Sequence, residues 1–137
     1  MSLIGDPDSP PFSFFCLLIK FKKRKEKDMQ TQPWKIYYFP LNGRGDCARA
    51  MCCHSGAKWE NCITQFADWP TLKPDMPNNA MPALELCDGT RIGQAACVNR
   101  YIARQCNYYP WDAMECAKME FICECYKDIF DSLFAPI

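Results

Sequence analysis

The feature that most constrains the fold is a change from strand-like to helix-like patterning across a short turn that contains glycine. Residues 35–49 read KIYYFPLNGRGDCAR. The apolar and aromatic run at 35–39 is typical of a strand, and the spacing of apolar residues at 45–55 predicts a helix that Gly56 can end. One side of this helix carries Ala48, Met51, Cys52 and Ser55. A further strand after the helix would complete a βαβ unit.

The remaining pattern supplies that strand and then a hairpin. In chain order it predicts a strand at 59–66, a proline-rich loop with at most a short helix at 67–80, strands at 82–86 and 90–92, and a helix that opens near Ala95. Asp88-Gly89, between the last two strands, is a hairpin turn signal. A βαβ unit joins parallel strands by a right-handed crossover, and the hairpin adds antiparallel strands to the same sheet. The sequence therefore predicts an α/β fold with a thioredoxin-like βαβ–ββα layout.

The first turn does not carry the cysteine pair of a disulfide-exchange protein. Such a protein would have C-x-x-C there, where this chain has Phe39-Pro40-Leu41-Asn42. The eleven cysteines are scattered and include no C-x-x-C pair, so we expect reduced thiols in a cytoplasmic protein. Cys52-Cys53-His54 can be read as a metal cluster or as small buried hydrophobes. Adjacent helical residues point in different directions, so we favour the second interpretation and predict no metal site.

Composition adds bounds on domain number and on partners. The chain has 137 residues, with 16 basic and 16 acidic side chains, and 49% of its residues are apolar. This is material for about one compact domain. The balanced charge indicates no nucleic-acid partner.

Residues 1–30 differ in kind from the rest of the chain. Residues 10–19 are apolar and residues 20–27 are almost entirely basic, an order opposite to that of a secretory signal. The apolar part is also too short to span a bilayer. A membrane-surface anchor is one interpretation, although we do not expect membrane contact through residues 10–27. A disordered extension, or a mispredicted start with Met29 opening the folded part, is favoured.

Several motifs carry a family resemblance. The first is Tyr38-Phe39-x-x-x-Gly43-Arg44-x-Asp46-x-x-Arg49, and the later ones are Ala67-Asp68-Trp69-Pro70, Lys73, Met81-Pro82-Ala83-Leu84-Glu85, Asp88-Gly89 and the QAACVNRY run at 94–101. In order and spacing, from residue 35 to about residue 106, they resemble the N-terminal motifs of cytosolic glutathione transferases, especially the sigma-like and helminth types. The resemblance implies a thioredoxin-like glutathione-binding domain at 31–107 and the start of an all-α domain at 108–137.

The resemblance implies that the hydroxyl of Tyr38 is catalytic. The glutathione thiol has a pKa of about 8.5, so little of it is thiolate at neutral pH. A phenol that donates a hydrogen bond to the thiolate contributes roughly 1.5–3 kcal/mol, or about 1–2 pKa units. Strand alternation places Ile36 and Tyr38 on one face and Tyr37 on the other, and the family register selects Tyr38. Arg44 is similar to the family's arginine that adds positive field near this hydroxyl.

The other matched segments imply contacts to the tripeptide. The implied glutathione-binding residues are Tyr38, Trp69, Lys73, Asn79, Ala80, Met81, Pro82, Gln94 and Ala95. Met81-Pro82 resembles the family's cis-proline site, where the preceding residue pairs its backbone with the cysteinyl part of glutathione. Lys73 would face the glycyl carboxylate beside Trp69. A solvated lysine and a packing tryptophan are the plain alternatives.

Gln94 and Ala95 open the helix whose N–H groups would hold the γ-glutamyl carboxylate. Here the sequence departs from the family, whose usual pair is Gln-Ser. Ala95 keeps the backbone donor and loses the hydroxyl, which puts about 1 kcal/mol of glutathione affinity in question.

The end of the sequence departs further from the family pattern. The family continues into an all-helical domain, whereas this sequence ends at Ile137 after one helix predicted at 111–134. The apolar stripe of that helix consists of Ile122, Cys125, Tyr126, Ile129, Phe130 and Leu133. Such a stripe indicates a covering partner, and the resemblance implies a homodimer. A truncated gene model or fragment and a true short form are both open interpretations.

The resemblance implies the function of a detoxifying glutathione transferase. Such an enzyme conjugates the glutathione thiolate to a small electrophile, or isomerises or reduces one with glutathione as co-substrate. The alternative, from a different class, is a non-catalytic glutathione-binding or interaction module.

Overall fold

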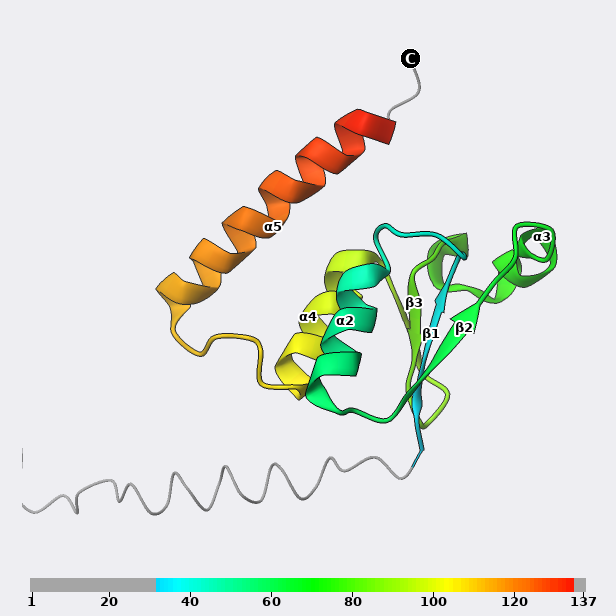
Figure 1. Cartoon of the computed structure of the whole chain (residues 1–137), viewed down its shortest axis with the longest axis horizontal. Coiled ribbons are helices and arrows are strands. Elements are labelled where there is room, and N and C mark those ends of the chain that lie inside the picture. Colours follow the sequence, from blue (N-terminus) through cyan, green and yellow to red (C-terminus); the bar gives the residue numbers. More distant parts are fainter. Residues whose placement is uncertain (1–31, 135–137) are drawn as a thin grey trace, which may run out of the picture. The chain divides into compact units, whose positions relative to one another are not determined.

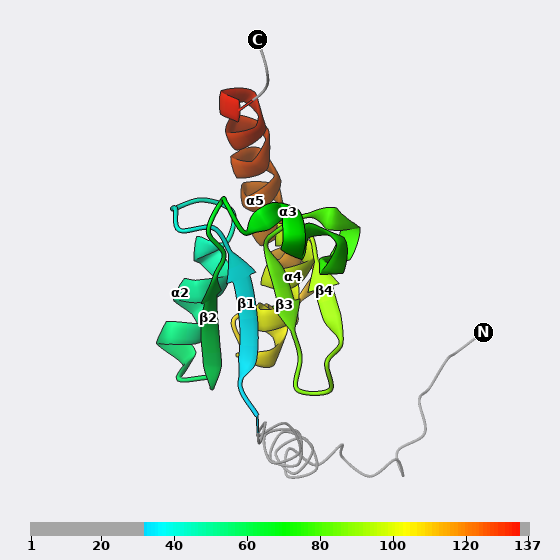
Figure 2. The same cartoon turned by 90° about the vertical axis from the view of Figure 1, so that its right-hand side faces the viewer.

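The computed structural model describes residues 32–134, in which four strands form one sheet (Figure 2). The strands are β1 (Trp34–Tyr38), β2 (Trp59–Ile63), β3 (Ala83–Glu85) and β4 (Arg91–Gly93), in the spatial order β2-β1-β3-β4. β1 pairs with β2 in parallel, while β3 is antiparallel to both β1 and β4. This topology confirms the predicted α/β, βαβ–ββα layout. The interpretations of residues 1–30 concern a segment outside the described residues.

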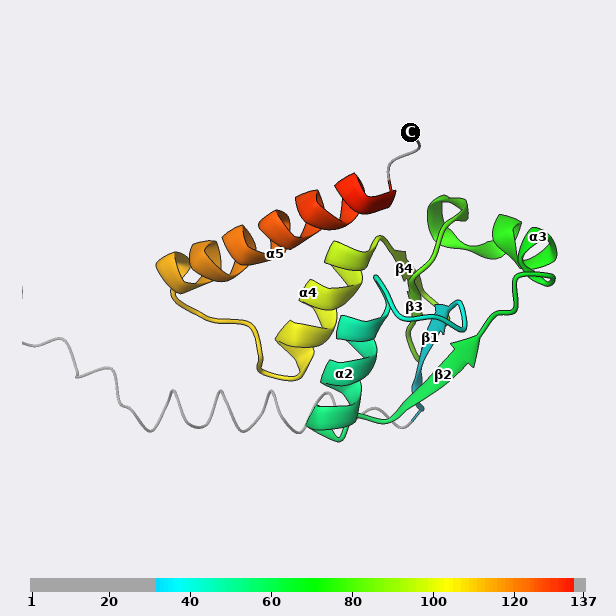
Figure 3. The same cartoon turned by 45° about the horizontal axis from the view of Figure 1, so that its top comes forward.

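Helices cover the sheet unevenly. They are α2 (Asp46–Ser55), α3 (Trp69–Leu72), α4 (Ala95–Gln105) and α5 (Ala113–Phe134), with 3-10 turns at Lys73–Asp75 and Pro77–Asn79. α2 and α4 lie side by side against one face of the sheet, and the short α3 lies on the opposite side (Figures 1 and 3). The proline-rich loop therefore contains one short helix, as its sequence predicted.

One strand and one helix show why elements are shorter than their sequence patterns predicted. The strand predicted at 59–66 ends at Ile63, because the chain then turns and the Asp68 N–H donates to the Gln65 carbonyl at 3.1 Å. The helix predicted from residue 111 begins at Ala113. The cause is the Asp112 carboxylate, which accepts hydrogen bonds from the second and third N–H groups of the helix at 2.9 and 3.0 Å and so caps it.

The core lies between the sheet and the helix pair α2 and α4. It consists of Trp34, Ile36, Ala48, Cys52, Leu84, Val98 and Ile102, all buried. Burial of each large aliphatic side chain in such a cluster stabilises the fold by about 1.5–3 kcal/mol. The sheet and the two helices are thus fixed to each other, and the ends of β1 and β3 have defined positions.

The cysteine cluster on α2 is only partly a set of buried hydrophobes. Cys52 is fully buried, and this burial raises the pKa of its thiol to about 12. Cys53 and His54 are exposed, so the interpretation of the whole cluster as buried is wrong beyond Cys52. The reason is helical geometry, because one helix face packs on the sheet and the next two positions turn away from it. Within the described residues, no group of histidine, cysteine or acidic side chains is placed to hold a metal ion.

Helix α5 contacts the preceding elements through charged side chains. Arg100 of α4 forms ion pairs with Glu120 and Glu124 at 3.1 and 3.2 Å, and Arg44 forms one with Asp131. Exposed large apolar side chains of α5 include Phe121, Ile122, Tyr126, Ile129 and Leu133. Most of the predicted stripe is therefore uncovered in this chain. From residue 32 to residue 134, no helix is both long enough and apolar enough to cross a membrane.

Candidate functional site

Tyr38 is the last residue of β1, and its ring lies against the turn that leads into α2. The side chain is only 6% exposed. The backbone N–H of Arg44 donates a hydrogen bond to the Tyr38 Oη at 3.0 Å. Among residues 32–134, no side chain or carbonyl accepts the hydroxyl hydrogen of Tyr38. The oxygen is therefore fixed by the backbone, and the hydrogen is free to be donated to a ligand.

The two glycines of the Gly43-Arg44-Gly45 turn are required by this tyrosine. A Cβ atom on Gly45 would lie 2.6 Å from two ring atoms of Tyr38, and a Cβ atom on Gly43 would lie 2.9 Å from its Oη. Real Cβ atoms do not approach other atoms so closely. The turn can fold over the tyrosine only because both positions lack a side chain. The sequence motif contained these glycines, but their contact with Tyr38 was not predicted.

Arg44 contributes its backbone at the hydroxyl and its side chain elsewhere. Its guanidinium forms an ion pair with Asp131 and lies over the Phe130 ring, 5.1 Å from the ring centroid. The side chain is about half exposed at 47%. The group that this residue presents to Tyr38 is thus the N–H, whereas the resemblance implied a field from the guanidinium.

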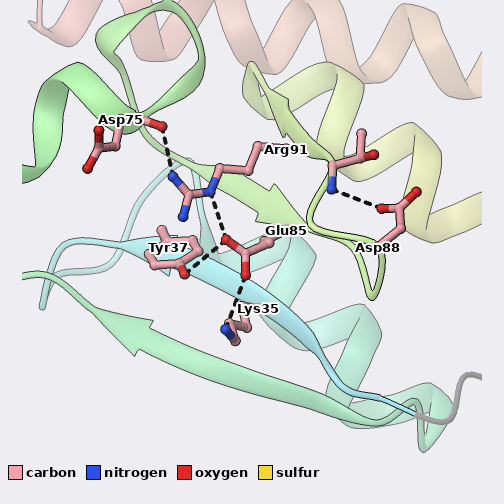
Figure 4. A network of polar contacts seen from close by, with 7 residues as sticks. Lys35, Tyr37, Asp75, Glu85, Asp88 and Arg91 are labelled. Atoms are coloured by element: carbon pink, nitrogen blue, oxygen red, sulfur yellow. Dashed lines mark hydrogen bonds and ion pairs between the residues drawn. The ribbon is translucent and has the colours of Figure 1, made fainter.

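Tyr37 faces the opposite side of the sheet and is occupied there (Figure 4). Its hydroxyl donates to Glu85 at 3.2 Å, and the Arg91 guanidinium lies over its ring at 5.4 Å from the centroid. Lys35 and Arg91 both pair with Glu85, and Arg91 also donates to the Asp75 carbonyl. Burial, followed by the Glu85 charge, raises the pKa of the Tyr37 hydroxyl. The predicted alternation of the two tyrosines is confirmed, and Tyr37 belongs to a structural network.

A shallow cavity on this side of the sheet is separate from Tyr38. Its volume is about 460 Å³, and its walls include Tyr37, Cys62 and Thr71. Neither Tyr38 nor any of the implied glutathione contacts lines it. Because none of these residues lines it, we assign this cavity no part in the chemistry of Tyr38.

The Glu85 network predicts a pH dependence of stability. The hydrogen bond from Arg91, assisted by Lys35, holds the pKa of the Glu85 carboxyl below its ordinary value. A carboxyl of this kind stabilises the fold above its unfolded pKa of about 4.3, and the contribution is lost as pH falls through the lower folded pKa. We expect Glu85→Gln to lower the free energy of unfolding by about 1 kcal/mol near pH 7 and by much less at about pH 3.

Urea unfolding of both proteins at the two pH values measures this effect. Glu115→Gln is a matched control, because it removes a solvent-exposed ion pair with Lys118. Such pairs contribute little, so the control should unfold like the parent chain at both pH values. An equal loss from Glu85→Gln at high and low pH would show that the effect does not come from its charge.

The remaining implied site segments meet at the same end of the sheet as Tyr38. Ala83 pairs with Tyr37 on one side and with Gly93 on the other. The adjoining residues at that end of the three strands are Tyr38, Pro82 and Gln94. The Met81–Pro82 peptide bond is cis, which confirms that expectation, and Ala80 before it is extended with φ −144° and ψ 157°. Backbone groups of Ala80 and Met81 are therefore next to the tyrosine strand.

Gln94 has the most unusual backbone in this region. Its φ of 66° and ψ of 121° lie where side chains are rarely found, and Ala95 after it begins α4. Gly93 lies so close to the Pro77–Asn79 turn that a Cβ there would come within 2.8 Å of the Pro77 ring. The strained backbone conformation of Gln94 costs about 1–3 kcal/mol. Strain of this kind persists where the surrounding structure imposes it, often at ligand sites. No side chain caps this helix, and within residues 32–134 the N–H groups of Ala95, Ala96 and Cys97 have no acceptor.

Trp69 and Lys73 lie on α3 and directly after it. Trp69 is half-buried, and its ring meets Phe39 edge-on at 5.4 Å between centroids. Phe39 in turn stacks on Phe66 at 4.8 Å. Lys73 is exposed and has no ion pair among the described residues. Trp69 is thus held by packing, and the exposed Lys73 is free to meet an anion. These positions fit contacts to glutathione, and they also fit a packing tryptophan and a solvated lysine.

The chain is similar in sequence and in structure to known proteins. The chain is 35% identical to glutathione S-transferase 1 of Ascaris suum over 100 residues, which are 73% of this chain and 48% of that protein. It is 33% identical to S-crystallin 3 of Enteroctopus dofleini over 98 residues, covering 72% and 46%. The structure of a sigma class glutathione transferase from Fasciola hepatica matches with a TM-score of 0.65 at 28% identity, covering 78% and 55%. No family model matches the chain.

These matches concern only part of each relative. The chain spans about half the length of the curated relatives it matches, which are 46% and 48% covered in the two examples above. Their shared fold is a thioredoxin-like N-terminal domain followed by helices, as seen here in the sheet, α2, α4 and α5. The chain is therefore homologous to glutathione S-transferases and S-crystallins.

Proposed function

We propose that residues 31–107 bind glutathione and that the chain serves a glutathione transferase, which conjugates the glutathione thiolate to small electrophiles. The observation that carries this proposal is the state of the Tyr38 hydroxyl. Its oxygen accepts the Arg44 N–H, and its hydrogen has no acceptor among the described residues. A hydroxyl held in this way is prepared to donate to an anion.

The chemical gain lies in the ionisation of the thiol. A hydrogen bond from Tyr38 to the glutathione sulfur stabilises the thiolate, by about 1.5–3 kcal/mol for a bond to a charged group. The thiolate fraction at neutral pH then rises about tenfold or more. The thiol proton passes to solvent, and the thiolate sulfur forms a thioether bond to the electrophilic carbon. In a substitution the carbon–leaving-group bond breaks and its electron pair departs with the leaving group, whereas in an addition the electron pair stays on the acceptor, which takes up a proton from solvent.

The tripeptide would lie along the sheet end described above. The extended Ala80 and Met81, before cis-Pro82, offer backbone groups to the cysteinyl part, with Asn79 on the same edge. The first turn of α4 at Gln94 and Ala95 offers N–H groups to the γ-glutamyl carboxylate. Trp69 and Lys73 would meet the glycyl end, and Arg44 would add its N–H at the tyrosine. Residues from 108 onward would begin the helical part that meets the electrophile.

A non-catalytic glutathione-binding module is the second candidate. Two observations favour it: Ala95 lacks the hydroxyl of the usual Gln-Ser pair, and some matched relatives are named S-crystallins rather than transferases. Retention on immobilised glutathione without turnover of a general electrophile would favour this module over the transferase.

The proposed transferase function has three further parts. They are isomerase and peroxidase variants of the glutathione chemistry, a cytoplasmic location, and a homodimer that covers the α5 stripe.

Calorimetry of glutathione binding to the chain tests the proposal, and one substitution sharpens it. We expect Ala95→Ser to tighten binding by up to about tenfold, because the added hydroxyl can donate to a carboxylate at the helix start. Ala96→Ser is the control, since it adds the same hydroxyl one exposed position further along α4 and should leave the affinity unchanged. Absence of glutathione binding in the parent chain would overturn the proposal. Equal affinities of all three chains for glutathione would show that its γ-glutamyl carboxylate does not bind at the start of α4.

A further inference from the structure

Arg49 is an arginine of α2 whose side chain turns back toward the strand that precedes the helix. Its Nη2 donates to the Phe39 carbonyl at 3.2 Å, and its Nη1 donates to the Leu41 carbonyl at 3.5 Å. The same Nη1 pairs with the Asp46 carboxylate at 3.3 Å. The guanidinium carbon lies 5.2 Å from the centroid of the Tyr38 ring. One side chain therefore touches the start, the middle and the end of the turn between β1 and α2.

Burial of the Arg49 guanidinium has a free-energy cost that its contacts in the turn have to offset. The Arg49 side chain is only 16% exposed, and its Nε is buried without a partner in the described part of the chain. Desolvation of a guanidinium costs several kcal/mol unless other contacts offset it. A planar fork that reaches two carbonyls and a carboxylate at once is a geometry that lysine cannot reproduce. The side chain is thus used for its shape as well as its charge.

The turn itself has few other bonds. The Asp46 N–H donates to the Gly43 carbonyl at 3.1 Å, and the Asp46 carboxylate accepts the Gly43 N–H at 2.7 Å. Within residues 32–134, the carbonyls of Phe39 and Leu41 have Arg49 as their side-chain donor and no backbone donor. Asp46 therefore holds the second half of the turn at Gly43, and within residues 32–134 the Arg49 side chain is what ties its first half, at Phe39 and Leu41, to α2.

We propose that Arg49, held by Asp46, is the positioning residue that aims the Tyr38 hydroxyl. It fixes the turn so that the Arg44 N–H meets the Tyr38 oxygen, and its guanidinium covers one face of the tyrosine ring. With the oxygen accepting this N–H, the hydroxyl hydrogen remains available for donation to a ligand. The role in thiolate formation rests on the proposed glutathione chemistry, whereas the role in placing the turn does not.

Amide hydrogen exchange of the Arg44 N–H tests the placement directly, without any ligand. In Arg49→Met the exchange of this amide should become at least about tenfold faster, while the core amides of Ile36 and Leu84 change far less. Arg49→Lys keeps the charge without the fork and should recover only part of the protection. Arg104→Met is the matched control, because Arg104 also lies over a tyrosine ring, that of Tyr109 at 4.5 Å, away from the turn.

A second readout concerns the function. The ultraviolet absorption of the thiolate, followed against pH with glutathione bound, should show the thiol of Arg49→Met ionising at higher pH than in the parent chain. Unchanged exchange of the Arg44 amide in Arg49→Met, or full recovery by Arg49→Lys, would overturn the positioning role. A parent chain that does not bind glutathione would overturn the proposed function alone, because the exchange result stands without ligand.

Discussion

Replacing Gly45 with alanine is expected to push Tyr38 out of place and to cost both stability and thiolate formation. The new Cβ would stand 2.6 Å from two atoms of a buried ring that has no room to retreat. Gly45 has φ −86° and ψ −14°, a conformation that alanine adopts freely, so the effect is purely steric. Overpacking of this kind costs about 1–3 kcal/mol, and we expect a value near the upper end because the neighbour is a rigid ring.

Denaturant unfolding and exchange of the Arg44 amide measure the two parts of this effect. Gly56→Ala serves as the control. Gly56 has φ 71°, and an added Cβ there meets nothing within 4 Å. This variant should lose about 1 kcal/mol through backbone strain alone and keep the Arg44 amide protected. A Gly45→Ala chain with parental stability and a protected Arg44 amide would show that the ring can yield.

Periodicity in the sequence was sufficient to predict the sheet and the orientation of the tyrosine pair. Alternation along β1 places Ile36 and Tyr38 in the core layer and Tyr37 on the far side, and the pairings with β2 and β3 follow the predicted order. These features depend on burial of one strand face, which local apolar spacing encodes directly. The helix that begins at Ala95 was likewise predicted from apolar spacing, whereas the cis-proline was predicted from the family resemblance, and the structure has both.

Other features depend on contacts that no local pattern encodes. The clash that forbids a side chain at Gly45, the reach of Arg49 back to Phe39 and the turn of Arg44 toward Asp131 all join residues of different elements. A glycine on each side of an arginine, soon after a strand tyrosine, was the one available signal that the turn folds against that ring. The positive φ of Gln94 had no signal, because glutamine has no preference for that conformation.

Tyr38→Phe is expected to lower the rate of glutathione conjugation by about tenfold or more, because it removes the hydroxyl that we propose donates to the sulfur. The phenylalanine ring fills the same space against Gly45 and loses only the oxygen beside Gly43, so the fold and the affinity for glutathione should change little. One structural cost is expected. The Arg44 N–H loses its acceptor, and its amide should exchange faster even though the turn stays in place.

Tyr37→Phe provides the opposite pattern and completes the test. This change removes a hydrogen bond to Glu85 on the other face of the sheet, so it should cost about 1 kcal/mol of stability and leave the thiolate fraction unaltered. Turnover of a general electrophile and the pH dependence of thiolate absorption are measured for both variants, in a chain long enough to turn over the electrophile. If Tyr37→Phe abolished thiolate formation while Tyr38→Phe left it intact, the assignment of Tyr38 would be wrong. The strand would then have to present its other face to glutathione, where Glu85 would repel the thiolate and oppose the reaction.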